Sequence, residues 1–228
     1  MWREPPHPDP AAAPLRALAE HVFSRAAGAP LITGNAVRIL RDAAENYPAW
    51  LAAIRAADRT ILFENYIVEN DDVGREFVEA LVERAQAGVT VRVIYDWLGS
   101  FAVGARGLWA PLIAAGGEVR CFNPPRLDSP FGWLTRDHRK GLIVDGRVAH
   151  ISGLCVGQRW MGDPHRGVDP WRDTGVEIRG PAVADAALAF AQVWETMGPA
   201  LPPEEFNEPV VIEPAGDVAM RVPVSYTH

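Results

Sequence analysis

Cysteine is scarce in this sequence, and long apolar runs are missing. The 228 residues include two cysteines, Cys121 and Cys155, which are too few for a disulfide framework and match no zinc-binding spacing. We therefore expect a reducing, cytoplasmic environment. No run of about eighteen or more apolar residues occurs, which argues against a membrane-spanning helix, and the stretch MWREPPHPDP lacks the apolar centre of a signal peptide. Peripheral contact with the inner membrane stays open, because it needs only an exposed apolar patch.

A basic excess is also missing. The sequence has 29 Asp plus Glu against 22 Lys plus Arg, which gives a net charge of −7. Proteins that bind the nucleic acid backbone usually carry more basic than acidic residues, so the charge argues against nucleic acid as a partner. Any anion-binding site must therefore come from a local cluster of cations. The hydrophobic content of 48% is ordinary for a globular domain.

Lysine is nearly absent. Of the 22 basic residues, Lys140 is the single lysine, and every other one is an arginine. Lys140 lies within TRDHRKGLIVDGR, residues 135–147, just before an apolar run. An ammonium and a guanidinium differ in shape and in donor geometry, so a site that needs the smaller group does not accept arginine. The position of this lysine therefore indicates a functional site rather than a general surface cation.

The three cations that precede the apolar run are not equivalent. Side chains alternate along an extended segment, so His138 and Lys140 are expected on one face and Arg139 on the other. The neighbouring ammonium disfavours protonation of the imidazole, and a neutral imidazole can attack a phosphorus centre while Lys140 holds a non-bridging oxygen. Asp145, at the following turn, is expected to order the loop or to anchor a cation. The alternative for His138 is a hydrogen-bonded packing residue.

Strand-like and helix-like segments alternate along the chain. The expected strands are NAVRILRD, TILFENYIV, VTVRVIYDW and EVRCFN, and the expected helices are YPAWLAAIRAAD, DDVGREFVEALVERAQAG and GPAVADAALAFAQVWETM. GLIVDGRVAHIS predicts a hairpin that turns at Asp145-Gly146. The sequence therefore predicts an α/β fold with a mixed, mostly parallel sheet and helices on both faces.

The pattern His138-x-Lys140-x4-Asp145 matches the HxKxxxxD signature of the phospholipase D superfamily. ILFENYIV, DDVGREFVEAL, VTVRVIYDWLGS and WRDTGVEIRGPAV resemble the first half of its cardiolipin synthase-like branch, and the likeness runs from about Leu31 to Met197. The resemblance implies an α/β/α sandwich. It also implies transfer of a phosphodiester through a phosphohistidine, with no metal or other cofactor.

Carried over by position, the resemblance assigns roles to four residues. His138 would be the nucleophile, Lys140 a phosphate ligand and Asp145 a structural member of the site. Asp173, in WRDT, resembles the acidic residue that orients the second ring nitrogen of the nucleophile. A buried ion pair between Asp173 and Arg172 is the alternative.

Residues 152–155 depart from the family pattern. Family members typically have Gly-Gly or Gly-Ser, one further residue and then an Asn that contacts phosphate, whereas this chain has SGLC. Cys155 is a poor donor where an amide is expected, and Ser152 could partly replace it. We take Ser152, Gly153 and Cys155 as candidate substrate contacts. Glu64 is a further candidate, because it interrupts a buried strand and should need an arginine partner near the site.

Composition and resemblance together divide the chain into three parts. Residues 1–30 are expected to form a flexible lead-in and a helix, and residues 31–198 a phospholipase D-like catalytic half-domain. Residues 199–228 are expected to be a Pro-rich linker and the start of a truncated second half. We expect the first helix to pack on the domain, with a membrane-surface helix as the alternative. Its apolar residues are Leu15, Leu18, Val22 and Phe23.

Three functions remain open, because complete enzymes of this type place two HxKxxxxD halves around one site and this chain has one half. The favoured function is a phosphatidyltransferase or phospholipase D half-site for a phosphatidylglycerol-like phospholipid, completed by dimerisation or by a partner. The alternatives are a homodimeric nuclease-type phosphodiesterase and a catalytically silent half-domain. Six apolar residues could form a mouth for acyl chains or belong to the core: Trp97, Leu98, Phe101, Trp109, Phe131 and Trp133.

Overall fold

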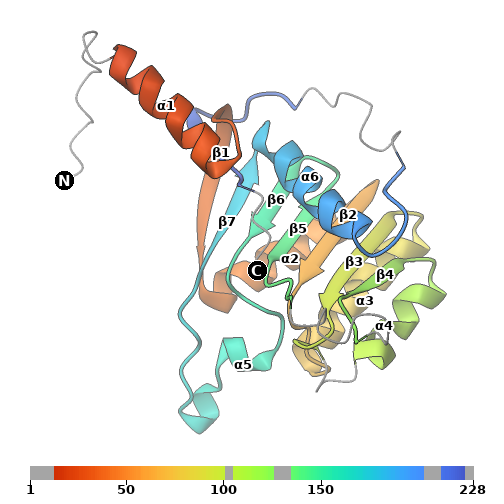
Figure 1. The fold of residues 1–228 in the computed structure, drawn as a ribbon. Helices are drawn as coiled ribbons and strands as arrows, with labels where there is room; N and C mark the ends of the chain where they lie inside the picture. The colour runs from red at the N-terminus through yellow and green to blue at the C-terminus, as the bar shows by residue number, and fades with distance from the viewer. Residues whose placement is uncertain (1–12, 101–104, 126–134, 203–211, 224–228) are drawn as a thin grey trace.

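The computed structural model describes residues 13–100, 105–125, 135–202 and 212–223. Within these residues an eight-stranded sheet runs in the order β4-β3-β2-β5-β6-β7-β1-β8 (Figure 1). The strands are β1 (Ile32–Arg41), β2 (Thr60–Asn65), β3 (Thr90–Asp96), β4 (Glu118–Phe122), β5 (Lys140–Val144), β6 (Val148–Ile151), β7 (Thr174–Arg179) and β8 (Val218–Met220). The helices are α1 (Ala13–Ala27), α2 (Asp42–Arg55), α3 (Asp72–Gln86), α4 (Ala105–Ala114), α5 (Gln158–Met161) and α6 (Ala182–Glu195), with a short 3-10 helix, η4 (Pro164–Arg166).

The sheet is mixed, as predicted, but parallel pairs are in the minority. Among the described strands, β2–β3 and β3–β4 are parallel, whereas β2–β5, β5–β6, β6–β7, β1–β7 and β1–β8 are antiparallel. The expectation of a mostly parallel sheet is therefore wrong. The antiparallel pairs include β1, which pairs with β7 from the far end of the domain. Local pattern does not reveal such long-range pairing.

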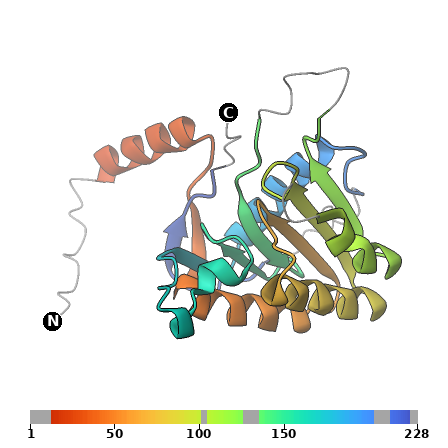
Figure 2. The same ribbon diagram turned by 90° about the horizontal axis from the view of Figure 1, so that it is seen from below.

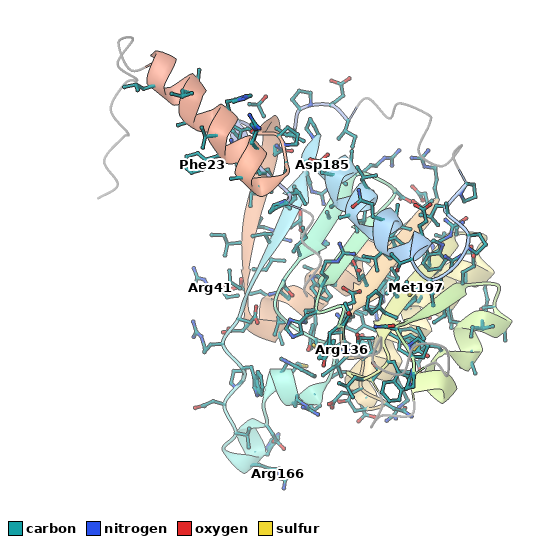
Figure 3. All side chains as sticks on the ribbon, viewed as in Figure 1. Phe23, Arg41, Arg136, Arg166, Asp185 and Met197 are labelled. Atoms are coloured by element: carbon teal, nitrogen blue, oxygen red, sulfur yellow. The ribbon has the colours of Figure 1, made fainter. Side chains whose placement is uncertain are left out.

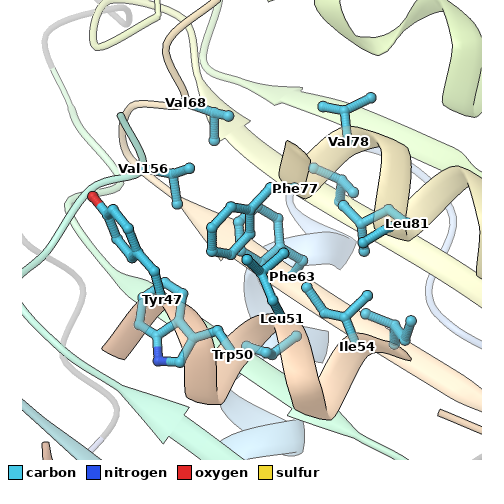
Figure 4. Close-up of a cluster of buried hydrophobic side chains, with 14 of the residues drawn as sticks. Tyr47, Trp50, Leu51, Ile54, Phe63, Val68, Phe77, Val78, Leu81 and Val156 are labelled. Carbon is cyan, nitrogen blue, oxygen red and sulfur yellow. The ribbon is translucent and has the colours of Figure 1, made fainter. Parts of the chain in front are cut away.

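Helices cover both faces of the sheet, which confirms the layered α/β prediction (Figure 2). Side chains alternate along β2, so Ile61 and Phe63 point to the face covered by α2 and α3, and Leu62 points to the face covered by α6. The core on the α2 and α3 face is rich in aromatic rings (Figure 4). There Phe63 stacks on Phe77, with ring centroids 6.2 Å apart. Close packing of these aromatic rings keeps rigid the part of the sheet that leads to the carboxyl ends of β2 and β3.

Helix α2 begins at Asp42, earlier than the sequence suggested, which places Pro48 inside the helix. A proline there lacks the N–H of one helical hydrogen bond. The helix continues because Tyr47, Trp50 and Ile54 are buried on one of its sides, where tertiary packing outweighs the local cost.

Helix α1 extends away from the sheet (Figures 1 and 2). The side of α1 that meets the body of the domain is polar, since Glu20 and Ser24 contact Arg221. Its large apolar side chains are 54 to 71% exposed, so the expectation that they pack on the domain is wrong. The exposed residues are Leu15, Leu18, Val22 and Phe23, the last labelled in Figure 3.

The C-terminal segment contributes to the same sheet. Val218–Met220 forms β8 and pairs with β1 at the edge of the sheet, beyond the Pro-rich stretch. The described part of residues 199–228 thus packs with the domain that precedes it. Across the described ranges, no helix combines the length and the apolar character that crossing a bilayer requires.

Candidate active site

Lys140 lies at the edge of the sheet where β5 begins and the neighbouring strand β2 ends. It is the first residue of β5, in register with Asn65, the last residue of β2. Alternation with Leu142 directs its side chain to the α2 and α3 face, where the residue is only 3% exposed. Its Nζ donates to the His138 carbonyl oxygen at 2.6 Å and lies 5.2 Å from the centroid of the Tyr66 ring.

The buried ammonium of Lys140 has no ion-pair partner among the residues that the structure describes. Burial lowers the pKa of Lys140, and the carboxylates of Asp137, Asp173 and Asp96 partly oppose that shift. An unpaired buried charge is costly, and proteins usually keep one only where it has a function. Lys140 is therefore placed to hold an anion that the protein itself does not supply.

His138 shares this face and is open to solvent. Its ring lies 4.8 Å from the Tyr66 ring, centroid to centroid. Partial burial of the ring lowers the pKa of His138, the cation of Lys140 lowers it further, and Asp137 and Asp96 act in the opposite direction. The imidazole is therefore neutral at neutral pH, which is the form that can act as a nucleophile.

Arg139 points to the opposite face, as the alternation predicted. Its guanidinium donates to Glu64 Oε1 from Nε at 3.1 Å and from Nη2 at 2.6 Å, and Nη2 also donates to the Ala189 carbonyl of α6. The predicted arginine partner of Glu64 is thus confirmed. Burial raises the pKa of Glu64 well above its usual value, Asp137 adds to the rise and Arg139 opposes it. Because Glu64 lies on the α6 face, the structure does not bring it together with Lys140 as a substrate contact.

Asp96 anchors the segment that leads into His138. It is the fully buried last residue of β3. Its carboxylate accepts hydrogen bonds from Arg136 Nη1 and from the backbone N–H of Asp137, both at 3.0 Å. Arg136, labelled in Figure 3, thereby lies at the carboxyl edge of the sheet with its side chain largely buried. Sequence reasoning missed Asp96, although a carboxylate at the end of a parallel strand is a recognisable signal.

Asp145 acts at the other end of β5. Its carboxylate accepts hydrogen bonds from the backbone N–H groups of Asp58, Arg59 and Thr60, at 2.8 to 2.9 Å. It lies five residues after Lys140, at the opposite end of the strand, a span of about 17 Å. Burial raises the pKa of Asp145, but the three N–H donors outweigh burial and the net shift is downward. Of the two roles expected for Asp145, the structure shows the ordering of a loop.

Replacing Asp145 with alanine is expected to destabilise the fold by about 3 kcal/mol, because three part-buried hydrogen bonds to a charged acceptor are lost. Urea denaturation measures the loss, and Asp145→Asn, which keeps one acceptor oxygen, should lose less. The folded-state pKa lies below the ordinary 3.8, so this stabilisation is present above that pH and is lost as the pH falls through the lowered pKa. Equal stabilities of wild type and Asp145→Ala would contradict this role.

Asp173 adopts neither of the arrangements expected for it. Its Oδ1 accepts hydrogen bonds from the N–H groups of Gly153 at 3.1 Å and Thr174 at 2.7 Å, and no described bond joins it to His138. The ion pair of Arg172 is with Asp42, at 3.5 Å. A Cβ built on Gly153 would lie 2.4 Å from Asp173 Oδ2, so a side chain at this position would displace the Asp173 carboxylate. Asp173 stands near enough to Lys140 to act on its pKa and contributes negative charge to the site.

Ser152 and Cys155 hold the loop beside Lys140. Ser152 Oγ accepts from the N–H of Leu154 at 3.0 Å, and its own N–H donates to the Lys140 carbonyl at 3.2 Å. The Cys155 carbonyl accepts from the hydroxyl of Tyr47 at 2.6 Å. Burial raises the pKa of the Cys155 thiol, while the Lys140 cation and the Ile67 N–H oppose the rise. A protonated, buried thiol therefore lies close to the Lys140 ammonium.

The expected apolar mouth is only partly described. Trp109 is buried in the core, stacked on Tyr95, so it does not line a mouth. Leu98 is exposed and Trp97 is half-buried. Phe101, Phe131 and Trp133 lie outside the described residues.

Comparison with known proteins gives consistent matches. The family model described as "Cardiolipin synthase, PLD-like domain" matches residues 50–194. The chain is 36% identical over 194 residues to cardiolipin synthase A of Pseudomonas syringae pv. syringae (strain B728a), and 36% identical over 169 residues to cardiolipin synthase of Alkalihalophilus pseudofirmus (strain ATCC BAA-2126 / JCM 17055 / OF4). These alignments cover 80% and 72% of this chain but 39% and 33% of the relatives, so the chain spans well under half of their length.

Solved structures share the fold at low sequence identity. Nuc from Salmonella typhimurium, described as a phospholipase D family member, matches with a TM-score of 0.54 and 15% identity, over 73% of this chain and 98% of that chain. Phosphatidylserine synthase from Haemophilus influenzae Rd KW20 matches with a TM-score of 0.56 and 17% identity, over 75% of this chain and 40% of that chain. At these identities the likeness establishes the fold alone.

Proposed function

We propose a function from one premise: this chain belongs to the cardiolipin synthase family of phospholipase D-like domains. Membership confirms the resemblance predicted from the HxKxxxxD pattern. The proposed function is transfer of a phosphatidyl group from a phosphatidylglycerol-like phospholipid to an alcohol or to water. The observation that carries it is the buried ammonium of Lys140, unpaired within the described chain, on the same sheet face as the neutral, solvent-exposed imidazole of His138.

The chemistry assigned to these groups takes two steps. An imidazole nitrogen of His138 attacks phosphorus, the bond to the leaving alcohol breaks, and the leaving oxygen takes a proton from a general acid. In the second step the hydroxyl oxygen of the acceptor alcohol or of water attacks phosphorus and the bond to His138 breaks. The deprotonated general acid of the first step takes the hydroxyl proton and is restored. Lys140 binds a non-bridging oxygen and offsets the negative charge in both transition states.

The general acid belongs to a second HxKxxxxD half in this proposal. The acid must reach the leaving oxygen, which departs from the side of phosphorus opposite the attacking nitrogen of His138. The open side of His138 would face the corresponding side of a second half, supplied by a copy of this chain or by a partner. A phospholipid substrate also brings the chain to a membrane surface, in keeping with the peripheral location expected from the sequence.

A single-turnover experiment tests the proposal. The full chain is mixed with phosphatidylglycerol carrying ³²P in its phosphate, in mixed micelles, and quenched in base. Label that is stable in base and released in acid should appear on the protein, and mass spectrometry should place it on His138. Turnover with the label on another residue, or with no labelled protein at any time, would overturn the phosphohistidine. Light scattering on the same sample reports whether the reactive species is an assembly.

A further inference from the structure

Asn65 is a buried amide at the carboxyl end of β2. It is 1% exposed and is paired in register with Lys140 on one side and with Tyr95 of β3 on the other. Residues paired across neighbouring strands project from the same face, with Cβ atoms about 5 Å apart. The carboxamide of Asn65 therefore lies next to the Lys140 side chain, at the edge that carries His138.

The orientation of this carboxamide follows from its hydrogen bonds. The N–H of Ile67 donates to Asn65 Oδ1 at 3.3 Å, which assigns the oxygen and turns the NH₂ group the other way. Asn65 Nδ2 is buried and has no hydrogen-bond partner among the protein groups that the structure describes. A buried donor without an acceptor costs about 1–3 kcal/mol, so its retention calls for an explanation.

Two donors therefore converge without an acceptor between them. Lys140 Nζ carries three N–H bonds, and the described chain offers it one oxygen, the His138 carbonyl at 2.6 Å. Cys155 lies close enough to Lys140 to act on its pKa, but its buried thiol sulfur is only a weak acceptor. An oxygen that entered beside Lys140 would satisfy both the ammonium and the amide.

We propose that the Asn65 carboxamide is a phosphate-binding donor that, together with Lys140, takes a non-bridging oxygen of the substrate. The inference rests on the proposed function of the same site. Asn65 Nδ2 is enclosed, so the oxygen reaches it when the flexible Lys140 side chain releases the His138 carbonyl and turns toward the anion. The anion then occupies a site with one charged and one neutral donor, and β2 contributes to binding as well as β5.

Equilibrium binding of inorganic phosphate to the full chain tests the proposal. Asn65→Leu should weaken binding about tenfold, and Asn65→Asp more, because it places a carboxylate beside Lys140. Stability separates this role from a structural one: relief of the unpaired Nδ2 donor offsets loss of the 3.3 Å bond from the Ile67 N–H, so the free energy of unfolding of Asn65→Leu should stay close to that of wild type. The control is Asn35→Leu, because Asn35 is buried but bonds to the Ile32 and Val218 carbonyls, so this variant should lose stability and keep phosphate affinity for its folded fraction.

The outcomes distinguish this proposal from the proposed function. If wild type binds no phosphate, or if Lys140→Ala binds as tightly as wild type, the assignment of the site fails and Asn65 fails with it. If Lys140→Ala is weakened but Asn65→Leu is not, the site stands and Asn65 is excluded. Should Asn65→Leu not fold, the side-chain NH₂ resonances of ¹⁵N-labelled wild type decide the matter. Those of Asn65 should shift as phosphate is added and those of Asn35 should not, and an unmoved Asn65 signal would overturn the proposal.

Discussion

Replacement of His138 by glutamine is expected to lower the rate of phosphatidyl transfer by about a thousandfold or more. Glutamine keeps a polar group of similar reach but has no nitrogen lone pair able to attack phosphorus. The substitution should not disturb the fold, because His138 is exposed and the described chain forms no hydrogen bond to its ring. Activity should therefore be lost while the urea midpoint stays unchanged.

The pH profile of the wild-type chain gives an independent check on this role. Burial and the Lys140 cation lower the pKa of His138 below its ordinary 6.5, so the neutral nucleophile persists to a more acidic pH than for a free histidine. We expect kcat/KM to fall on the acid side with an apparent pKa below 6.5. Lys140→Met should move the pKa of His138 upward, because one of its two lowering causes is gone. NMR titration of the imidazole measures this directly.

His165→Gln is the matched control for His138→Gln. His165 is an exposed histidine in η4, distant in sequence from the HxKxxxxD pattern, and the variant should retain the wild-type rate. A rate for His138→Gln within tenfold of wild type would remove His138 from the chemistry. An equal loss in both variants would point to a general effect of the substitution rather than to nucleophilic attack.

Features that depend on the local backbone could be predicted from the sequence. The division of His138, Arg139 and Lys140 between two faces needs only the period of two along an extended segment. The hairpin at Asp145-Gly146 follows from turn chemistry, and both residues adopt the positive φ angles that such a turn requires, 54° and 66°.

Features that depend on which strands become neighbours could not be predicted. Asn65 and Asp96 reach the site because β2 and β3 are parallel and end at the same edge, where β5 begins. No local pattern indicates that β5 inserts beside β2. The resemblance likewise could not set the direction of the Asp173 carboxylate, because the close approach of Gly153 and the N–H of Thr174 determine it.

Replacement of Lys140 by arginine is the second large effect, and it should occur without any loss of charge. The Lys140 side chain is buried, and its ammonium lies between the His138 carbonyl at 2.6 Å and the Tyr66 ring at 5.2 Å. A planar guanidinium is larger and directs its donors as a fixed fork, so it cannot hold the same phosphate oxygen from this position. We expect transfer to fall by about a hundredfold or more. Arg172→Lys, the reverse exchange at an exposed site, should leave the rate unchanged.

The stability of Lys140→Met should change in the opposite direction to its activity. Methionine fills a similar volume and removes a buried charge that has no ion-pair partner in the described chain, so the free energy of unfolding should rise by about 1 kcal/mol or more. Transfer should be lost, because no cation remains to bind the phosphate. A lysine that served the fold would behave in the reverse way, with a lower free energy of unfolding and activity retained by the folded fraction. Urea denaturation and single-turnover rates on the same samples therefore decide whether Lys140 is kept for chemistry at the expense of stability.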